Sequence, residues 1–112
     1  MAEYEIARRV PRYPFVVEVA VSDAYSKAQT KAQTATLGLY GCGIVTSKPL
    51  AQGTGVRLTL FYRGAEVKAL GIVAYVRSDL DMGIAFTDID QESERILDKW
   101  ITELQQSSAR KT

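Results

Sequence analysis

Three arginines near the start of the chain are the residues whose type and spacing best suit the binding of an anion. Arg8, Arg9 and Arg12 lie in the segment ARRVPRYPF, where Pro11 and Pro14 flank the third arginine. Because proline fixes its own φ and disfavours helical backbone in the residue before it, we predict an extended arm here. Four residues of such an arm span roughly 13 Å. Guanidinium groups bind phosphate or the edge of guanine in bidentate fashion, so the arm suits an object with several acceptor groups. A solvated leader without a ligand is the alternative.

The composition excludes several classes of protein. The chain has 112 residues, of which 46% are hydrophobic and 24% charged, as expected for one globular domain. It contains no histidine and a single cysteine, Cys42, which removes the catalytic triad, the Cys-His pair and the usual zinc sites. The carboxylate pairs Asp79/Asp81 and Asp88/Asp90 fit turns and a helix cap. We therefore predict a protein that is not an enzyme and has no cofactor or metal.

Charge and hydropathy bear on partners and location. A net charge of +1 argues against binding of a nucleic acid polymer, although Tyr13, Tyr40 and Tyr62 could stack on RNA bases beside the arginines. No apolar run approaches the roughly 18 residues of a membrane span, and MAEYEIARR lacks the apolar region of a secretory signal. We expect a cytoplasmic monomer or weak dimer without membrane insertion.

The central part of the chain shows the alternation of apolar and polar residues that is typical of β-strands. The segment SDAYSKAQTKAQTAT, with its duplicated KAQT, is interpreted as a polar turn or hairpin tip that leads into the second strand. Turns are also expected at 63–66 and 78–81. Six strands with short turns favour a small barrel or sandwich. Apart from the second strand, the predicted strands are 13–21, 44–46, 56–62, 67–76 and 82–89.

The end of the chain changes to a helical period. Asp90 is a suitable N-cap, and Glu92 and Glu94 lie where they favour the positive end of the helix dipole. An apolar stripe predicts that this helix packs on the barrel. The organisation expected is an arginine arm over 1–12, a β-barrel with its closing helix over 13–106, and a frayed tail over 107–112. The stripe is formed by Ile96, Leu97, Trp100, Ile101 and Leu104.

This order of arm, β-domain and helix resembles the PilZ family, small bacterial β-barrel domains that bind the second messenger cyclic di-GMP. The resemblance covers about residues 7–104. It implies an all-β fold with a C-terminal helix, a small six-stranded antiparallel barrel of PilZ type. The matching segments are RRVPR at 8–12 for the R-x-x-x-R arm, TLGLYG at 36–41 where the family has [DN]-x-S-x-x-G, KPLAQGTGVRLTL at 48–60 and GIAFTDID at 83–90.

The resemblance also implies roles for individual residues. Arg8 and Arg12 correspond to the arginines that grip the guanine and phosphate groups of the ligand, with Arg9 as an auxiliary contact. The second motif departs from the family pattern.

Thr36 stands at the position of Asp or Asn and Gly38 at that of Ser, whereas Gly41 matches. Together these departures are expected to cost about 2 kcal/mol, or roughly thirtyfold in affinity. A shifted alignment instead makes Thr34 and Thr36 the hydrogen-bonding pair.

Two functions follow from the resemblance. In the first, the protein is a non-catalytic receptor that binds cyclic di-GMP, orders its arm over the ligand and thereby contacts a partner protein in the control of motility or biofilm. In the second, it is a PilZ-like adaptor that binds no nucleotide and acts by protein contacts, for example in type IV pilus or motility control.

Overall fold

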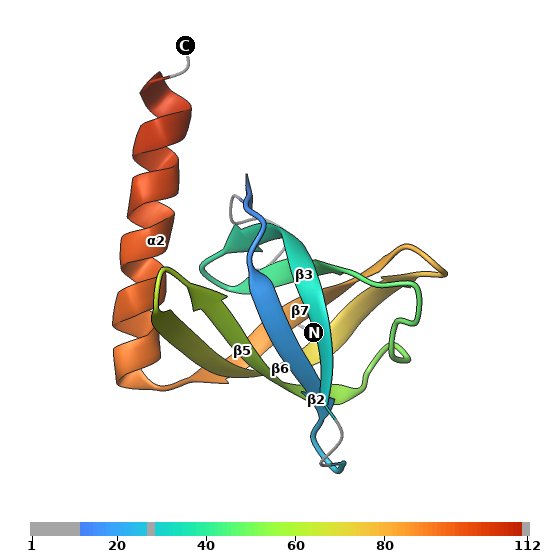
Figure 1. The fold of residues 1–112 in the computed structure, drawn as a ribbon. Helices are drawn as coiled ribbons and strands as arrows, with labels where there is room; N and C mark the ends of the chain where they lie inside the picture. Colours follow the sequence, from blue (N-terminus) through green and yellow to red (C-terminus); the bar gives the residue numbers. More distant parts are fainter. Residues whose placement is uncertain (1–11, 27–28, 111–112) are drawn as a thin grey trace.

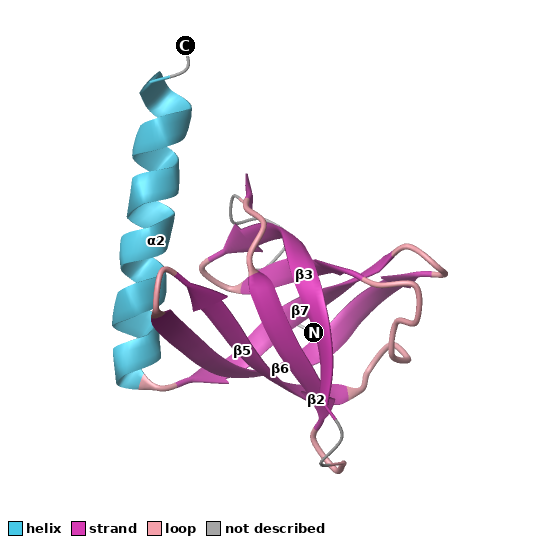
Figure 2. Ribbon diagram, viewed as in Figure 1, coloured by secondary structure: helices cyan, strands magenta, loops and turns pink. Residues whose placement is uncertain are grey.

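The computed structural model of the chain describes residues 12–26 and 29–110. These residues form a β-barrel followed by a long helix, as Figures 1 and 2 show. The elements, in chain order, are β1 (Tyr13–Pro14), β2 (Glu18–Asp23), β3 (Gln29–Gly38), β4 (Gly41–Val45), β5 (Gly55–Tyr62), β6 (Ala65–Arg77), β7 (Asp81–Ile89) and α2 (Gln91–Arg110).

The strands close into an antiparallel barrel. Within the described residues their order is β1-β3-β2-β5-β6-β7-β4, and β4 pairs in turn with β3, so that six strands form a ring. The short strand β1 is additional and pairs with the end of β3, through Tyr13 opposite Leu37 and Pro14 opposite Thr36. The predicted six-stranded antiparallel barrel with a C-terminal helix is thus confirmed.

The segment predicted as one strand over 13–21 is in fact two strands, so that prediction is wrong in detail. The pairing with β3 is interrupted between Phe15 and Val17, and the Thr34 side chain bridges this interruption. The Thr34 hydroxyl donates a hydrogen bond to the carbonyl oxygen of Phe15 at 2.6 Å and accepts one from the backbone N–H of Val17 at 3.0 Å. Thr34 is 1% exposed, so these bonds are shielded from water.

Two expected turns are present. Arg63 and Gly64 connect β5 to β6 with φ values of 51° and 80°, the left-handed conformation that a two-residue hairpin turn of type I′ requires. Asp79, with a φ of 65°, lies in the turn between β6 and β7. The second KAQT copy, residues 31–34, lies inside β3 rather than in a hairpin tip.

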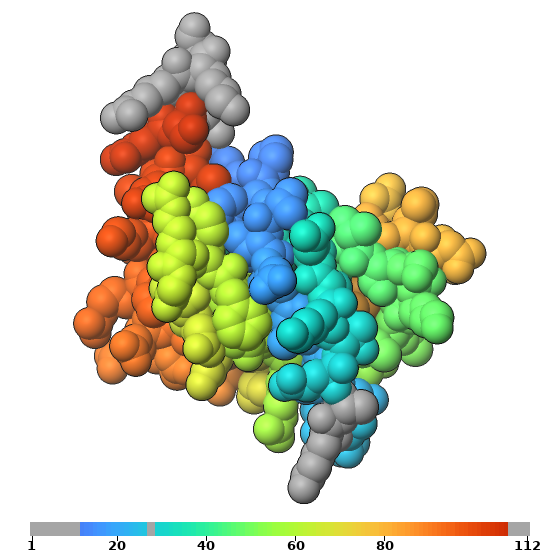
Figure 3. Space-filling model, in the orientation of Figure 1, coloured from blue at the N-terminus to red at the C-terminus, as the bar shows by residue number. Residues whose placement is uncertain are grey.

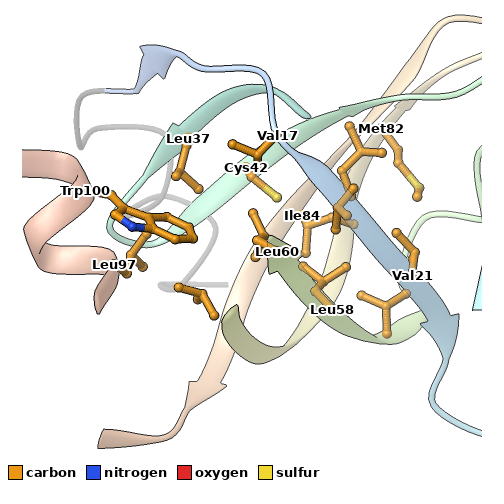
Figure 4. Packing of buried hydrophobic residues seen from close by; sticks show 14 of the residues in the cluster. Val17, Val21, Leu37, Cys42, Leu58, Leu60, Met82, Ile84, Leu97 and Trp100 are labelled. Atoms are coloured by element: carbon orange, nitrogen blue, oxygen red, sulfur yellow. The ribbon is translucent and has the colours of Figure 1, made fainter. Parts of the chain in front are cut away.

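Helix α2 closes one end of the barrel and completes the core. Its side chains Leu97 and Trp100 lie beside Leu37 and Leu60 of the barrel interior (Figure 4). Phe15 and Tyr62 add edge contacts, because the Tyr62 ring lies 5.5 Å from Trp100 and 4.8 Å from Phe15 between ring centroids. The space-filling view shows the segment after residue 12 between β3 and the β5–β6 hairpin (Figure 3).

The start of α2 is capped as predicted. Asp90 accepts a hydrogen bond from the backbone N–H of Ser93 at 2.7 Å, and this bond holds the pKa of the Asp90 carboxyl below its ordinary value. The helix continues to Arg110, past residue 106, where the closing helix was expected to end. No helix of the described ranges is both long and apolar enough to cross a membrane.

Thr34→Val is expected to destabilise the protein by about 1–3 kcal/mol, because it leaves the buried N–H of Val17 without its acceptor. The free energy of unfolding in urea would measure this loss. Thr30→Val, at an exposed position of the same strand, is the matched control and should change stability by less than about 0.5 kcal/mol. Equal effects of the two substitutions would contradict the bridging role of Thr34.

Candidate functional site

Arg12 lies against the turn of the β3–β4 hairpin. It immediately precedes β1, and Gly38 and Gly41 face each other where the hairpin ends. A β-carbon at position 41 would lie 2.9 Å from Nη2 of Arg12 and 2.3 Å from the carbonyl oxygen of Ile84. Glycine at position 41 therefore makes room for the guanidinium of Arg12.

The guanidinium of Arg12 has an unsatisfied donor. Its Nε is buried and has no hydrogen-bond partner within the described part of the chain. An unpaired buried donor costs about 1–3 kcal/mol, and more when the group is charged. This arrangement is suited to an anionic acceptor that approaches the guanidinium from outside the barrel.

A row of paired residues crosses four strands next to Arg12. Thr36 of β3 is opposite Gly43 of β4, Gly43 is opposite Gly83 of β7, and Gly83 is opposite Tyr75 of β6. A β-carbon at position 83 would lie 1.9 Å from Cε2 of Tyr75, so the ring lies directly on this glycine. A β-carbon at position 43 would lie 2.9 Å from Oγ1 of Thr36 and 3.8 Å from the hydroxyl of Tyr75.

Arg12 beside Gly41 and the row of paired residues from Thr36 to Tyr75 share one face of the barrel. Cys42 and Ile44 are fully buried in the core. Because side chains alternate along a strand, Gly41 and Gly43 face the opposite side, with their Cα atoms about 6.8 Å apart. We call this surface the glycine face and define it by Arg12, Thr36, Gly41, Gly43 and Tyr75.

Cys42 lies behind the glycine face as a core residue. Its burial raises the pKa of the thiol to about 12, against the opposing influence of the positive charge on Arg12. The thiol is therefore protonated at neutral pH and is not an activated nucleophile. Within the described ranges, no group of three or more Cys, Asp or Glu residues could hold a metal ion.

The structure brings four of the six predicted site residues to the same end of β3 and β4. They are Arg12, Thr36, Gly38 and Gly41. Arg8 and Arg9 lie outside the described residues.

The structure does not favour the shifted alignment that used Thr34 and Thr36, because the Thr34 hydroxyl is buried and bonded to backbone groups on both sides. Tyr62 packs with Phe15 and Trp100, so its position does not suit base stacking.

Sequence reasoning did not identify Tyr75 as part of this face. Its position depends on the cross-strand register, which aligns it with Gly83 after an irregularity between Val73 and Tyr75. The available signal was the isolated glycine in the strand MGIAF, since such a glycine often marks close approach of another group.

A groove borders the other side of the β3–β4 turn. It has a volume of about 760 Å³ and lies between this turn, the end of β7 and the first half of α2. Its apolar wall includes Leu39, Tyr40 and Phe86, and three carboxylates and one cation line it as well. These charged residues are Asp88, Glu94, Asp98 and Arg95.

The closed antiparallel barrel and its covering helix define a small all-β domain with a C-terminal helix. The model of the PilZ domain family matches residues 7–103. The chain belongs to the PilZ domain family, whose members are generally regulatory receptor domains.

Solved structures of PilZ proteins share the fold. The PilZ domain of CeSA from a cellulose-synthesizing bacterium is 18% identical, with a TM-score of 0.69 over 85% of this chain and 98% of that one. The PilZ domain of YcgR from Escherichia coli, solved with c-di-GMP, is 15% identical, with a TM-score of 0.72 over 93% and 95%. MrkH of K. pneumonia in its apo state is 17% identical, with a TM-score of 0.72 over 94% of this chain and 53% of MrkH. No curated protein matches the chain.

The buried thiol gives a test of the core behind the site. At pH 8.5 the native protein should react with iodoacetamide at least about a hundredfold more slowly than the protein unfolded in urea, because the raised pKa keeps Cys42 protonated. Mass spectrometry of the alkylated protein measures both rates. Similar rates in the two states would show that Cys42 is exposed to solvent.

Proposed function

We propose that this PilZ domain is a non-catalytic receptor for cyclic di-GMP. The observation that carries the proposal is the position of Arg12, whose buried Nε lacks a partner beside Gly41. Arg12 is also the second arginine of the R-x-x-x-R arm in a chain that belongs to this family. The related domain of YcgR was solved with the same ligand.

Cyclic di-GMP carries two phosphates and two guanines, and the glycine face supplies groups that suit both. The Arg12 guanidinium can bond a phosphate or the O6 and N7 atoms of guanine. Gly41 makes room for this guanidinium, and Gly38 lies opposite Gly41 in the hairpin. The Thr36 hydroxyl supplies a further hydrogen bond in place of the family carboxylate or amide.

The arm would complete the site. Arg8 and Arg9 precede Arg12 by four and three residues, so an arm folded over the ligand adds two more cations. Ordering each arm residue costs about 1–2 kcal/mol, and hydrogen bonds to charged groups contribute about 1.5–3 kcal/mol each. Several contacts from the arm are thus needed to offset its ordering, and the ordered arm changes the surface that a partner protein meets.

We place this receptor in the cytoplasm as a monomer or weak dimer.

The groove beside Tyr40 favours a second function, an adaptor that acts by protein contact without nucleotide. Its apolar wall and its three carboxylates suit a partner segment that carries apolar and basic side chains. Leu39 and Tyr40 belong to the same turn as Gly41, so the groove and the glycine face meet at this turn.

Isothermal titration of the full chain with cyclic di-GMP tests the receptor function. The wild type is expected to bind saturably, with micromolar affinity, and not to bind GTP comparably. Arg12→Ala should weaken binding at least about tenfold, since a charge-assisted hydrogen bond contributes about 1.5–3 kcal/mol, and Arg8→Ala combined with Arg12→Ala should abolish it.

Arg57→Ala is the matched control, because Arg57 is an exposed arginine of β5, away from the glycine face. It should bind like the wild type. Absence of heat for folded wild-type protein at several hundred micromolar ligand would contradict the receptor function and favour the adaptor.

A further inference from the structure

The Thr36 and Tyr75 hydroxyls form a pair that the family motif does not include. Both lie within 4 Å of the point where a β-carbon of residue 43 would be, one from β3 and one from β6. The strands between them contribute Gly43 and Gly83, which have no side chains to separate the two hydroxyls. The two hydroxyls therefore lie over Gly43, which is itself buried.

The Tyr75 hydroxyl is held in place by packing. Its ring lies on Gly83, where a β-carbon would come within 1.9 to 2.5 Å of three ring atoms, and Tyr75 is half-buried. A ring fixed in this way presents its hydroxyl with little further loss of side-chain entropy when a ligand binds.

The hydroxyl pair and Arg12 are placed to contact one ligand. Gly41, against which Arg12 lies, is two residues from Gly43 on the same face of β4, about 6.8 Å away. Arg12, whose buried Nε has no partner in the described residues, supplies a positive charge at the same face. A nucleotide whose phosphate meets Arg12 can thus extend a base toward the hydroxyl pair.

The chemistry of the pair differs from that of an acidic residue at position 36. An aspartate accepts hydrogen bonds but cannot donate them when ionised, so it selects the N1–H and N2–H donors of guanine. A hydroxyl both donates and accepts. Two hydroxyls can therefore meet the donors of guanine or the N1 acceptor and N6 amino group of adenine.

We propose that Thr36 and Tyr75 together read one base of the ligand and accept either purine there. The ligand class of this chain would then be cyclic purine dinucleotides, including the mixed guanine–adenine compound, with the other base held as guanine by the arginines. This inference rests on the proposed function, since it concerns the specificity of the same site.

The proposed specificity can be tested by titrating the protein with cyclic di-GMP, the mixed cyclic GMP–AMP and cyclic di-AMP. For the wild type, the affinities for the first two ligands should differ by less than about tenfold, with cyclic di-AMP weaker because of the arginines. Thr36→Asp should increase the ratio of the affinity for cyclic di-GMP to that for the mixed ligand at least about tenfold, because aspartate favours guanine and disfavours adenine. Tyr75→Phe keeps the ring on Gly83 and should weaken both ligands about fivefold, the loss of one neutral hydrogen bond.

The results distinguish failure of the proposed hydroxyl pair from failure of the receptor function. Wild-type binding of cyclic di-GMP with an unchanged ratio in Thr36→Asp, or unchanged affinities in Tyr75→Phe, would overturn the role of the hydroxyl pair alone. No binding of any of the three ligands would overturn the receptor function itself. Thr36→Asn, which also restores the family pattern, serves as the second variant if Thr36→Asp alters the thermal melting of the protein.

Discussion

Closure of the barrel on strand β3 is the constraint on which the candidate site depends. One edge of β3 pairs first with β2 over Gln29–Gln33 and then with β1 at Thr36 and Leu37, while its other edge pairs with β4. The Thr34 hydroxyl bridges the point where one partner replaces the other. This arrangement brings Arg12, which precedes β1, next to the β3–β4 turn.

The glycine face follows from this closure. Along β4 the core side chains Cys42 and Ile44 alternate with Gly41 and Gly43, so one side of the strand is fully packed and the other carries no side chain before Val45. Bulkier residues at the two glycines would meet Arg12 or the Thr36 hydroxyl. The same strand thus contributes to the stability of the core on one side and makes room for Arg12, Thr36 and Tyr75 on the other.

Local patterns in the sequence were sufficient for most of the fold. Alternation predicted the strands from β5 to β7, and Asp90 predicted the start of α2, because both depend on neighbouring residues. The break at Phe15 was missed, since a buried threonine nineteen residues away supplies its hydrogen bonds. Arg12 and Gly41 were identified by their resemblance to motifs, whereas Tyr75 was not, because its place depends on a register irregularity in β6.

The most direct test of the account is the NMR signal of the Arg12 side-chain Nε–H group in the ¹⁵N-labelled full chain. On addition of cyclic di-GMP, the account predicts a saturable shift of this signal together with the backbone amides of Gly41 and Gly43, while the amide of the control residue Arg57 stays unchanged. A titration that leaves these three signals unmoved while others shift would place the ligand elsewhere and contradict the site.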